Sequence, residues 1–249
     1  MLTDVIIKTS IALFSAIAGG GLTFLIKLDH KKLCVLISLS AGALLGAAAF
    51  TLIPESSINL SVIEVAVSGI SGFLLFWVIS KYYAHICPAC SASHFDEQTT
   101  KKFSEIILTL FTALSFHSLL DGIAISTGHM HGHEEHNSIF LAITTHKFPE
   151  GLALASLMFG ANYSKAKIIT YVVLIELTTV VGGVIGYLLI GSDFPHYWMG
   201  ILMAHIAGGF VFLAMHAVLG EMLKNHKALV TLSFIAGLVL IFLVRLLVH

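Results

Sequence analysis

Charged side chains are scarce in this sequence. Only 11% of its 249 residues are Asp, Glu, Lys or Arg, against about 25% in soluble globular domains, while 57% are hydrophobic. This composition excludes an ordinary soluble domain and indicates a protein of the lipid bilayer. The sequence also lacks a basic patch interleaved with aromatic residues, so we expect no nucleic-acid partner.

Apolar blocks of about 20 residues, the length that crosses a membrane as a helix, recur along the whole chain. They predict an all-α polytopic membrane protein in which residues 1–249 form a single transmembrane domain. The first block has no small-residue cleavage site and is interpreted as a retained span. We expect eight transmembrane helices, at residues 5–26, 33–53, 62–80, 104–128, 138–160, 167–190, 198–219 and 229–247.

Lys and Arg are absent from alternate loops. The segments PESSINLS, GHMHGHEEHNS and GSDFPH contain neither residue. Because short cytoplasmic loops collect basic residues, both termini are predicted to lie outside. A cytoplasmic loop is expected at 81–103 and an outer, His-rich loop at 129–137. Ten of the thirteen basic residues then fall on the cytoplasmic side: Lys27, Lys31, Lys32, Lys81, Lys101, Lys102, Lys165, Lys167, Lys224 and Lys227.

Four ionisable residues stand well inside the expected spans, where each costs several kcal/mol unless it faces a cavity, a partner or an ion. They are Asp121, Lys147, Glu150 and Glu176. His117 precedes Asp121 by four residues and His146 precedes Glu150 by four, so each pair shares one helix face. The surrounding strings, HSLLDGIAI and HKFPEGLAL, also resemble each other.

Packed side by side, these two spans would bring two imidazoles and two carboxylates to one depth of the bilayer. Such a donor set suits Zn²⁺ and other first-row divalent ions. Pro149 would leave a backbone carbonyl without its helical partner, and Gly122 and Gly151 would allow close helix contact. A lone buried histidine is more often a packing residue, but two matching pairs in adjacent spans favour a metal site.

The motifs HSLLDG and HKFPEG resemble those of the ZIP (Zrt/Irt-like protein) family of divalent metal transporters. AGALLGAAAFTLIPES is similar to the second helix of that family, and AGGFVFLAMHAVLGE to its seventh. The resemblance implies an inverted repeat around helices 4 and 5. It also implies uptake of a divalent metal into the cytosol. Zinc is the expected substrate, with iron, manganese, cobalt and cadmium as alternatives that the sequence leaves open.

The resemblance assigns the first metal position to His117, Asp121, His146 and Glu150. The second position of binuclear members maps onto Ser118 and Lys147, with Glu176 or Thr179 from helix 6. An ammonium group cannot coordinate a cation. The second position is therefore expected not to form in this chain.

Further potential ligands lie in the loops. The outer loop contains His129, His131, His133 and His136, which would concentrate metal ions at the entrance, or would simply be solvated. The cytoplasmic loop contains His85, Cys87, Cys90 and His94, a set suited to zinc or copper. The alternative is an incidental or redox-active Cys pair.

Three further residues are candidates for the ion pathway. Glu55, at the outer end of the second span, would attract cations or would be an ordinary interfacial residue. His205 and His216 share one face of the seventh span. They would line an exit path, or His205 would approach Glu176. Packing or hydrogen bonding to a neighbouring helix explains them equally well.

The expected function is transport and not catalysis. The alternative is an intramembrane zinc hydrolase that uses the same ligands with an open position for water, and a sensor or structural site is a third interpretation. A small chain of this kind is typical of a prokaryotic plasma membrane. The sequence leaves open whether the protein acts as a homodimer.

Overall fold

A computed structural model describes residues 2–25, 30–83, 111, 114–127, 133–160, 163–190, 195–222 and 227–248. Within these ranges the chain is helical apart from short connections, as the composition predicts. One further helix comprises residues 114–127. The remaining elements are α1 (Leu2–Leu25), α2 (His30–Ala47), the π-helical turn η1 (Ala48–Leu52), α3 (Ile53–Asn59), α4 (Val62–Tyr83), α7 (His133–Gly160), α8 (Lys165–Ile185), the π-helical turn η2 (Gly186–Ile190), α9 (His196–Met222) and α10 (Lys227–Val248).

Six of the helical segments are long and apolar enough to cross a membrane: Leu2–Leu25, Cys34–Asn59, Val62–Ile79, Lys165–Leu189, His196–Met215 and Lys227–Leu246. The two other predicted spans correspond to helix 114–127 and to α7, which carry the buried His-acid pairs. Helix 114–127 is described over a length too short to cross a membrane by itself, whereas in α7 polar residues lower the mean hydropathy. In α7, the residues that mark the candidate site therefore weaken the span signal.

The second span continues further than the sequence suggests. We expected a loop to begin at Pro54, but α3 extends the helix to Asn59. Proline cannot donate a backbone hydrogen bond, and its ring would crowd the carbonyl four residues earlier in a regular α-helix. The wider π-helical turn η1 precedes it, with the Ile53 N–H donating to the Ala48 carbonyl, and the helix thus passes through Pro54.

The His-rich segment is also more helical than expected. Helix α7 begins at His133, so residues 133–137 belong to its first turns and not to a loop. The side chains of His133 and His136 lie outside the described residues, as do His129 and His131 entirely. At the opposite end of the bundle, α4 extends to Tyr83, three residues into the expected cytoplasmic loop.

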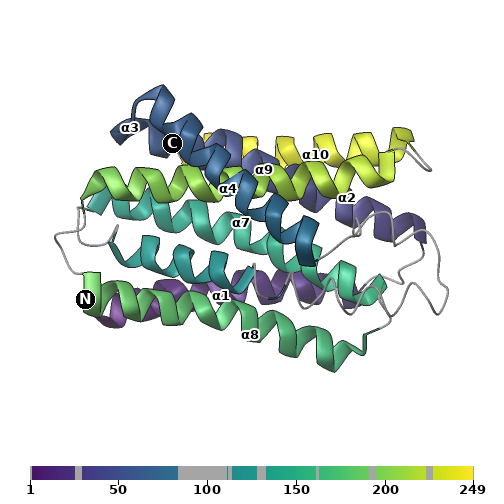
Figure 1. Ribbon diagram of the computed structural model, residues 1–249. Coiled ribbons are helices and arrows are strands. Elements are labelled where there is room, and N and C mark those ends of the chain that lie inside the picture. Colours follow the sequence, from purple (N-terminus) through teal and green to yellow (C-terminus); the bar gives the residue numbers. More distant parts are fainter. Residues whose placement is uncertain are drawn as a thin grey trace.

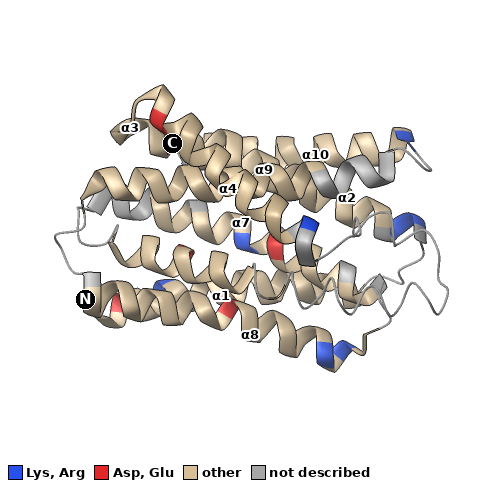
Figure 2. Ribbon diagram, in the orientation of Figure 1, with Lys and Arg blue, Asp and Glu red and all other residues tan. Residues whose placement is uncertain are grey.

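Spans that follow one another in the sequence run in opposite directions, whereas the most closely packed pairs, such as α1 with α7 and α2 with α10, run parallel. Both ends of the chain lie at the same end of the bundle (Figure 1). Toward the opposite end, basic residues lie at the starts of α2, α8 and α10 and at the end of α4 (Figure 2). These segments contain Lys31, Lys32, Lys81, Lys165, Lys167 and Lys227. Lys8 is an exception near the terminal end, where it forms an ion pair with Asp4 at 3.4 Å. We call these ends of the bundle the terminal end and the basic end.

Close backbone contacts divide the helices into two sets. The first set comprises α1, helix 114–127, α7 and α8, and the second comprises α2, α4, α9 and α10. A side chain on Gly19 would meet the Phe148 backbone, and one on Gly42 would meet that of Phe234. Among the described glycines, no such contact joins the two sets; Gly200 of α9 faces Ser56 of α3, which continues the span of α2. The sets meet where α2 packs against α7.

The glycine contacts repeat with one geometry in four helix pairs. In each pair, a glycine of the first helix faces a backbone carbonyl of the second helix. A glycine of the second helix faces, in return, the carbonyl of the residue three positions before the glycine of the first helix. The reciprocal contacts are Gly19 with Phe148 and Gly151 with Ala16; Gly122 with Thr179 and Gly182 with Leu119; Gly42 with Phe234 and Gly237 with Leu39; and Gly72 with His205 and Gly208 with Gly69.

This pattern gives the register of the inverted repeat. The pair formed by α1 and α7 corresponds to the pair formed by α8 and helix 114–127. The pair formed by α2 and α10 corresponds to the pair formed by α9 and α4. The same register places His117 opposite His146, and Asp121 opposite Glu150, as the two sequence motifs predict. The repeat therefore brings two copies of one His-acid motif to the middle of the first set.

Gly42→Ala should destabilise the protein, because the added methyl group would meet the Phe234 backbone, which cannot move as a side chain can. Overpacking of this kind costs about 1–3 kcal/mol. Gly21→Ala is the matched control, since nothing lies within 4 Å of a Cβ at that position. Thermal unfolding in detergent should show a lower transition temperature for Gly42→Ala only. Equal transition temperatures would contradict the close α2–α10 contact.

Candidate metal centre

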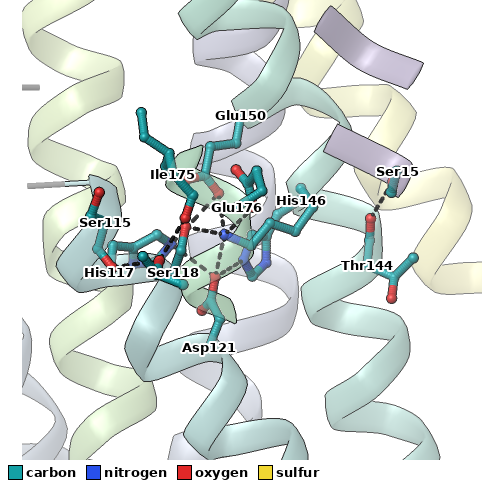
Figure 3. Close-up of polar contacts among 12 residues, drawn as sticks. Ser15, Ser115, His117, Ser118, Asp121, Thr144, His146, Glu150, Ile175 and Glu176 are labelled. Carbon is teal, nitrogen blue, oxygen red and sulfur yellow. Dashed lines mark hydrogen bonds and ion pairs between the residues drawn. The ribbon is translucent and has the colours of Figure 1, made fainter. Parts of the chain in front are cut away.

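Helix 114–127 and α7 bring the two His-acid pairs together. His117, Asp121, His146 and Glu150 are all buried, with at most 3% of each residue exposed. They converge between the helices in Figure 3. Each offers one potential ligand atom, and these four atoms lie within 4.8 Å of one another. The juxtaposition predicted from the sequence is therefore present.

Asp121 is the shared contact of this cluster. Its Oδ2 atom lies 3.3 Å from His117 Nε2 and 3.3 Å from His146 Nε2. The Oε2 atom of Glu150 lies 3.9 Å from His117 Nε2. Four ligand atoms bound tetrahedrally to Zn²⁺ would be about 3.3–3.6 Å apart, given bonds of about 2.0–2.2 Å. The donor atoms are thus close to the spacing that one ion requires.

Several buried polar atoms in the cluster form no hydrogen bond within the described part of the chain. They are His117 Nε2, Asp121 Oδ1, His146 Nδ1 and Glu150 Oε1. Most buried polar atoms in native proteins have a partner, so a group of exceptions needs an explanation. Of these atoms, His117 Nε2 is one of those that converge in the cluster, and a cation bound there would give it a partner. Imidazole and carboxylate groups are both common ligands of first-row divalent metals.

Lys147 lies in the same cluster and is completely buried. Its Nζ atom is 2.9 Å from Asp121 Oδ2, 3.0 Å from Glu150 Oε2 and 3.1 Å from Glu176 Oε2. It also donates a hydrogen bond to Ser118 Oγ at 2.7 Å. Three carboxylates and a hydroxyl therefore surround one ammonium group, which explains how the charge is tolerated at this depth.

The sequence left open whether Glu176 or Thr179 of α8 lies at the cluster, and in the structure Glu176 is the one that contacts Lys147. Thr179 lies about one turn further along α8 and is also buried, with its backbone against Gly122. The rotation of α8 about its own axis determines which of these two residues faces Lys147. The reciprocal contact of Gly182 with Leu119 sets that rotation.

Phe210 of α9 covers the two imidazoles. Its ring centroid lies 4.6 Å from that of His117 and 4.8 Å from that of His146. Only 1% of Phe210 is exposed, and the rest of its surroundings come from α2, η1, α9 and α10. The second helix set thus contacts the cluster through an aromatic ring. Sequence reasoning missed this residue, because a phenylalanine in an apolar helix gives no distinguishing signal.

Apolar side chains close the cluster toward the terminal end. Ile125, Ile139 and Ile143 of the first helix set pack with Met199 and Met203 of α9. These residues precede His146 on α7, follow Asp121 on helix 114–127, and lie near the start of α9. An ion that approaches from the terminal end therefore meets a hydrophobic barrier in this conformation.

Pro149 lies within α7, which continues to Gly160. Helix α1 packs directly on this stretch, with Gly19 against the Phe148 backbone and Ala16 against Gly151. Ser15 of α1 donates a hydrogen bond to the Thr144 carbonyl at 2.8 Å. The α1 helix therefore provides both close packing and a polar contact beside the turn that proline weakens.

The other candidate residues lie elsewhere. His205 Nδ1 is 2.8 Å from Ser71 Oγ of α4, so it hydrogen-bonds to a neighbouring helix and does not approach Glu176. Glu55 is 3.4 Å from Arg245 Nη1 of α10, which offsets its charge. The following lie outside the described residues or have undescribed side chains: His85, Cys87, Cys90, His94 and His216.

The fold and the cluster together define a class: a polytopic α-helical membrane protein with a buried His/carboxylate centre between antiparallel helices. The ZIP zinc transporter family matches residues 88–245, and the chain belongs to this family. The resemblance seen in the two motifs is thereby confirmed. Members of the family transport divalent metal ions, so this protein is a divalent metal transporter.

A relative is found among the archaea. The chain is 27% identical over 198 residues to the uncharacterized protein MJ1036 of Methanocaldococcus jannaschii, a match that covers 80% of this chain and 78% of the relative. The two proteins are therefore similar over most of their lengths.

Ser71→Ala should leave metal uptake within about twofold of the unmodified protein, because the Ser71–His205 contact lies between α4 and α9 and outside the cluster. The variant should be less stable by about 0.6 kcal/mol, the average for hydrogen bonds between membrane helices. Uptake assays in cells and thermal unfolding in detergent measure the two effects. A large loss of uptake would instead place His205 on the ion pathway.

Proposed function

We propose that this protein carries Zn²⁺, or a related first-row divalent ion, into the cytosol through the cluster of His117, Asp121, His146 and Glu150. The observation that carries this proposal is the convergence of four buried ligand atoms within 4.8 Å. Two nitrogen and two oxygen donors are a common set for Zn²⁺. Membership of the ZIP zinc transporter family supports the same substrate.

The distribution of charge supports one orientation of the protein in the membrane. The basic end of the bundle is the end that would face the cytosol, because short cytoplasmic loops collect Lys and Arg. The terminal end would then face outward, which puts both termini outside the cell (Figure 2). The archaeal relative supports a prokaryotic plasma membrane as the location.

Movement between the two helix sets would give the ion access to each side in turn. Close glycine contacts hold each set together. Between the sets, by contrast, Ile139 and Ile143 meet the side chains of Met199 and Met203. Such apolar contacts are weaker and less directional than close backbone packing. The boundary between the sets is therefore the place where an elevator-like or alternating-access movement would occur.

The state of Lys147 favours transport over hydrolysis. A zinc hydrolase needs a general base beside the metal, and the sequence offers Lys147 and Ser118 for the polar roles. In the structure, Asp121, Glu150 and Glu176 all pair with the Lys147 ammonium. Three negative neighbours stabilise the charged form, which cannot accept a proton.

Replacement of His117, Asp121, His146 or Glu150 by Ala should abolish zinc flux into liposomes that contain only the purified protein. Each change removes one of four ligands. The loss should therefore exceed the roughly 10- to 100-fold effect typical of outer-shell partners. Glu64→Ala is a suitable control, because this glutamate lies at the start of α4, away from the cluster, where it contacts Ser61 and also Tyr197 of α9. Normal flux in two of the four variants would refute the proposed site.

Lys147 would take the place of a second ion. Its ammonium binds the same carboxylate oxygens that lie nearest to the imidazoles. We therefore expect a mononuclear site in the unmodified protein. Lys147→Glu would replace this positive charge with a further carboxylate ligand.

Anomalous scattering from zinc-soaked crystals should show one ion at the cluster of the unmodified protein. A second ion should appear only in Lys147→Glu. Two well-occupied ions within about 4 Å of each other in the unmodified protein would contradict the proposed role of Lys147. The measurement counts ions directly and does not depend on transport activity.

A further inference from the structure

Glu176 is a third carboxylate at the cluster, and the four proposed ligands do not include it. It is completely buried, and its Oε2 atom lies 3.1 Å from Lys147 Nζ. Its other carboxylate oxygen, Oε1, has no hydrogen-bond partner within the described part of the chain. An ionised carboxylate in such surroundings depends on its charged neighbour, because removal of one partner of a buried pair is strongly destabilising.

The partners of Lys147 fall into two groups. Asp121 Oδ2 and Glu150 Oε2 lie among the proposed metal ligands, at 2.9 and 3.0 Å from the ammonium. Ser118 Oγ and Glu176 Oε2 do not. An ammonium has three N–H donors, so these four acceptors exceed what it can bind at once. It can release the first group and remain held by the second.

A metal ion and the ammonium compete for the same oxygens. A divalent ion bound to Asp121 and Glu150 would repel a positive charge held at about 3 Å from the same atoms. The ammonium therefore needs another negative partner within its reach when metal binds. In the described part of the cluster that partner is Glu176.

The number of charges in the cluster fits this arrangement. If Asp121, Glu150 and Glu176 are ionised, they carry three negative charges against the one positive charge of Lys147, and the imidazoles coordinate metal in their neutral form. The cluster then has two negative charges in excess, which one divalent ion neutralises. Without Glu176, the loaded cluster would hold an uncompensated positive charge in a buried region, which is costly.

We propose that Glu176 is a positioning residue that holds the Lys147 ammonium when a divalent ion occupies Asp121 and Glu150. This inference rests on the proposed function, since it requires a metal at that position. The Lys147–Glu176 pair then takes the space and the charge of a second ion. It also matches the charge of the cluster to a single divalent cation.

The pair can be tested by removing its two charges separately and together. Zinc affinity of the purified protein in detergent is measured by competition with a chromophoric chelator, and the absorption spectrum of bound Co²⁺ reports the coordination. Glu176→Gln should weaken zinc binding by about 10- to 100-fold, as loss of an outer partner typically does. The double variant Lys147→Met/Glu176→Gln should return to within about threefold of the unmodified protein, since net charge is restored.

The Co²⁺ spectrum should be the same in the double variant and in the unmodified protein, because Glu176 does not bind the metal in this proposal. Thr178→Val is the control for disturbance of α8, since the Thr178 hydroxyl donates to the Ser115 carbonyl of helix 114–127 at 2.8 Å. This variant should bind zinc normally. Size-exclusion profiles of all the variants show which of them are folded.

Three results would overturn the inference. Unchanged affinity in Glu176→Gln would mean that Glu176 has no influence on the site. A double variant that binds as weakly as Glu176→Gln, with an altered Co²⁺ spectrum, would make Glu176 a metal ligand. If Glu176→Gln fails to fold, the double variant alone decides, because weak binding by a folded double variant contradicts the proposal. Failure of the unmodified protein to bind zinc would refute the proposed function instead.

Discussion

The cost of holding ionised groups away from water governs the arrangement of this protein. A buried ammonium is tolerated only with anions around it, and buried carboxylates require a cation in return. Asp121, Glu150, Glu176 and Lys147 meet this condition together. Because they come from helix 114–127, α7 and α8, three helices must pack closely at one depth. The close glycine contacts of the first helix set provide that packing.

The inverted repeat explains why the centre is so symmetric and where the symmetry ends. His117 and His146 occupy equivalent positions, as do Asp121 and Glu150. Their neighbours Ser118 and Lys147 are also equivalent, yet one is a small hydroxyl and the other a long cation. The hydroxyl accepts the hydrogen bond that the cation donates. The replacement of a serine in one motif by a lysine in the other therefore makes the two sides of the centre chemically different.

Most of the fold follows from the sequence, because a chain in lipid must satisfy its backbone hydrogen bonds within helices. The two His-acid pairs were equally predictable, since identical spacing in adjacent antiparallel spans brings them together. Glu176 could not be separated from Thr179, because the choice depends on helix rotation. The contact of Phe210 with the imidazoles could not be predicted, because nothing in the sequence distinguishes this residue from the other apolar residues of its helix. The continuation of the second span through Pro54 depends on η1, a π-helical turn that hydropathy does not reveal.

The pairing of helices also affects the order in which the protein can be assembled. Gly42 of α2 packs against Phe234 of α10, about 190 residues later in the chain. At a synthesis rate of about 5–20 residues per second, the partner is made roughly 10–40 s after α2. During that time α2 must remain in the lipid without its final neighbour. The apolar composition of α2 makes it stable in lipid during this time. Its close contact with α10 forms only when that last helix inserts.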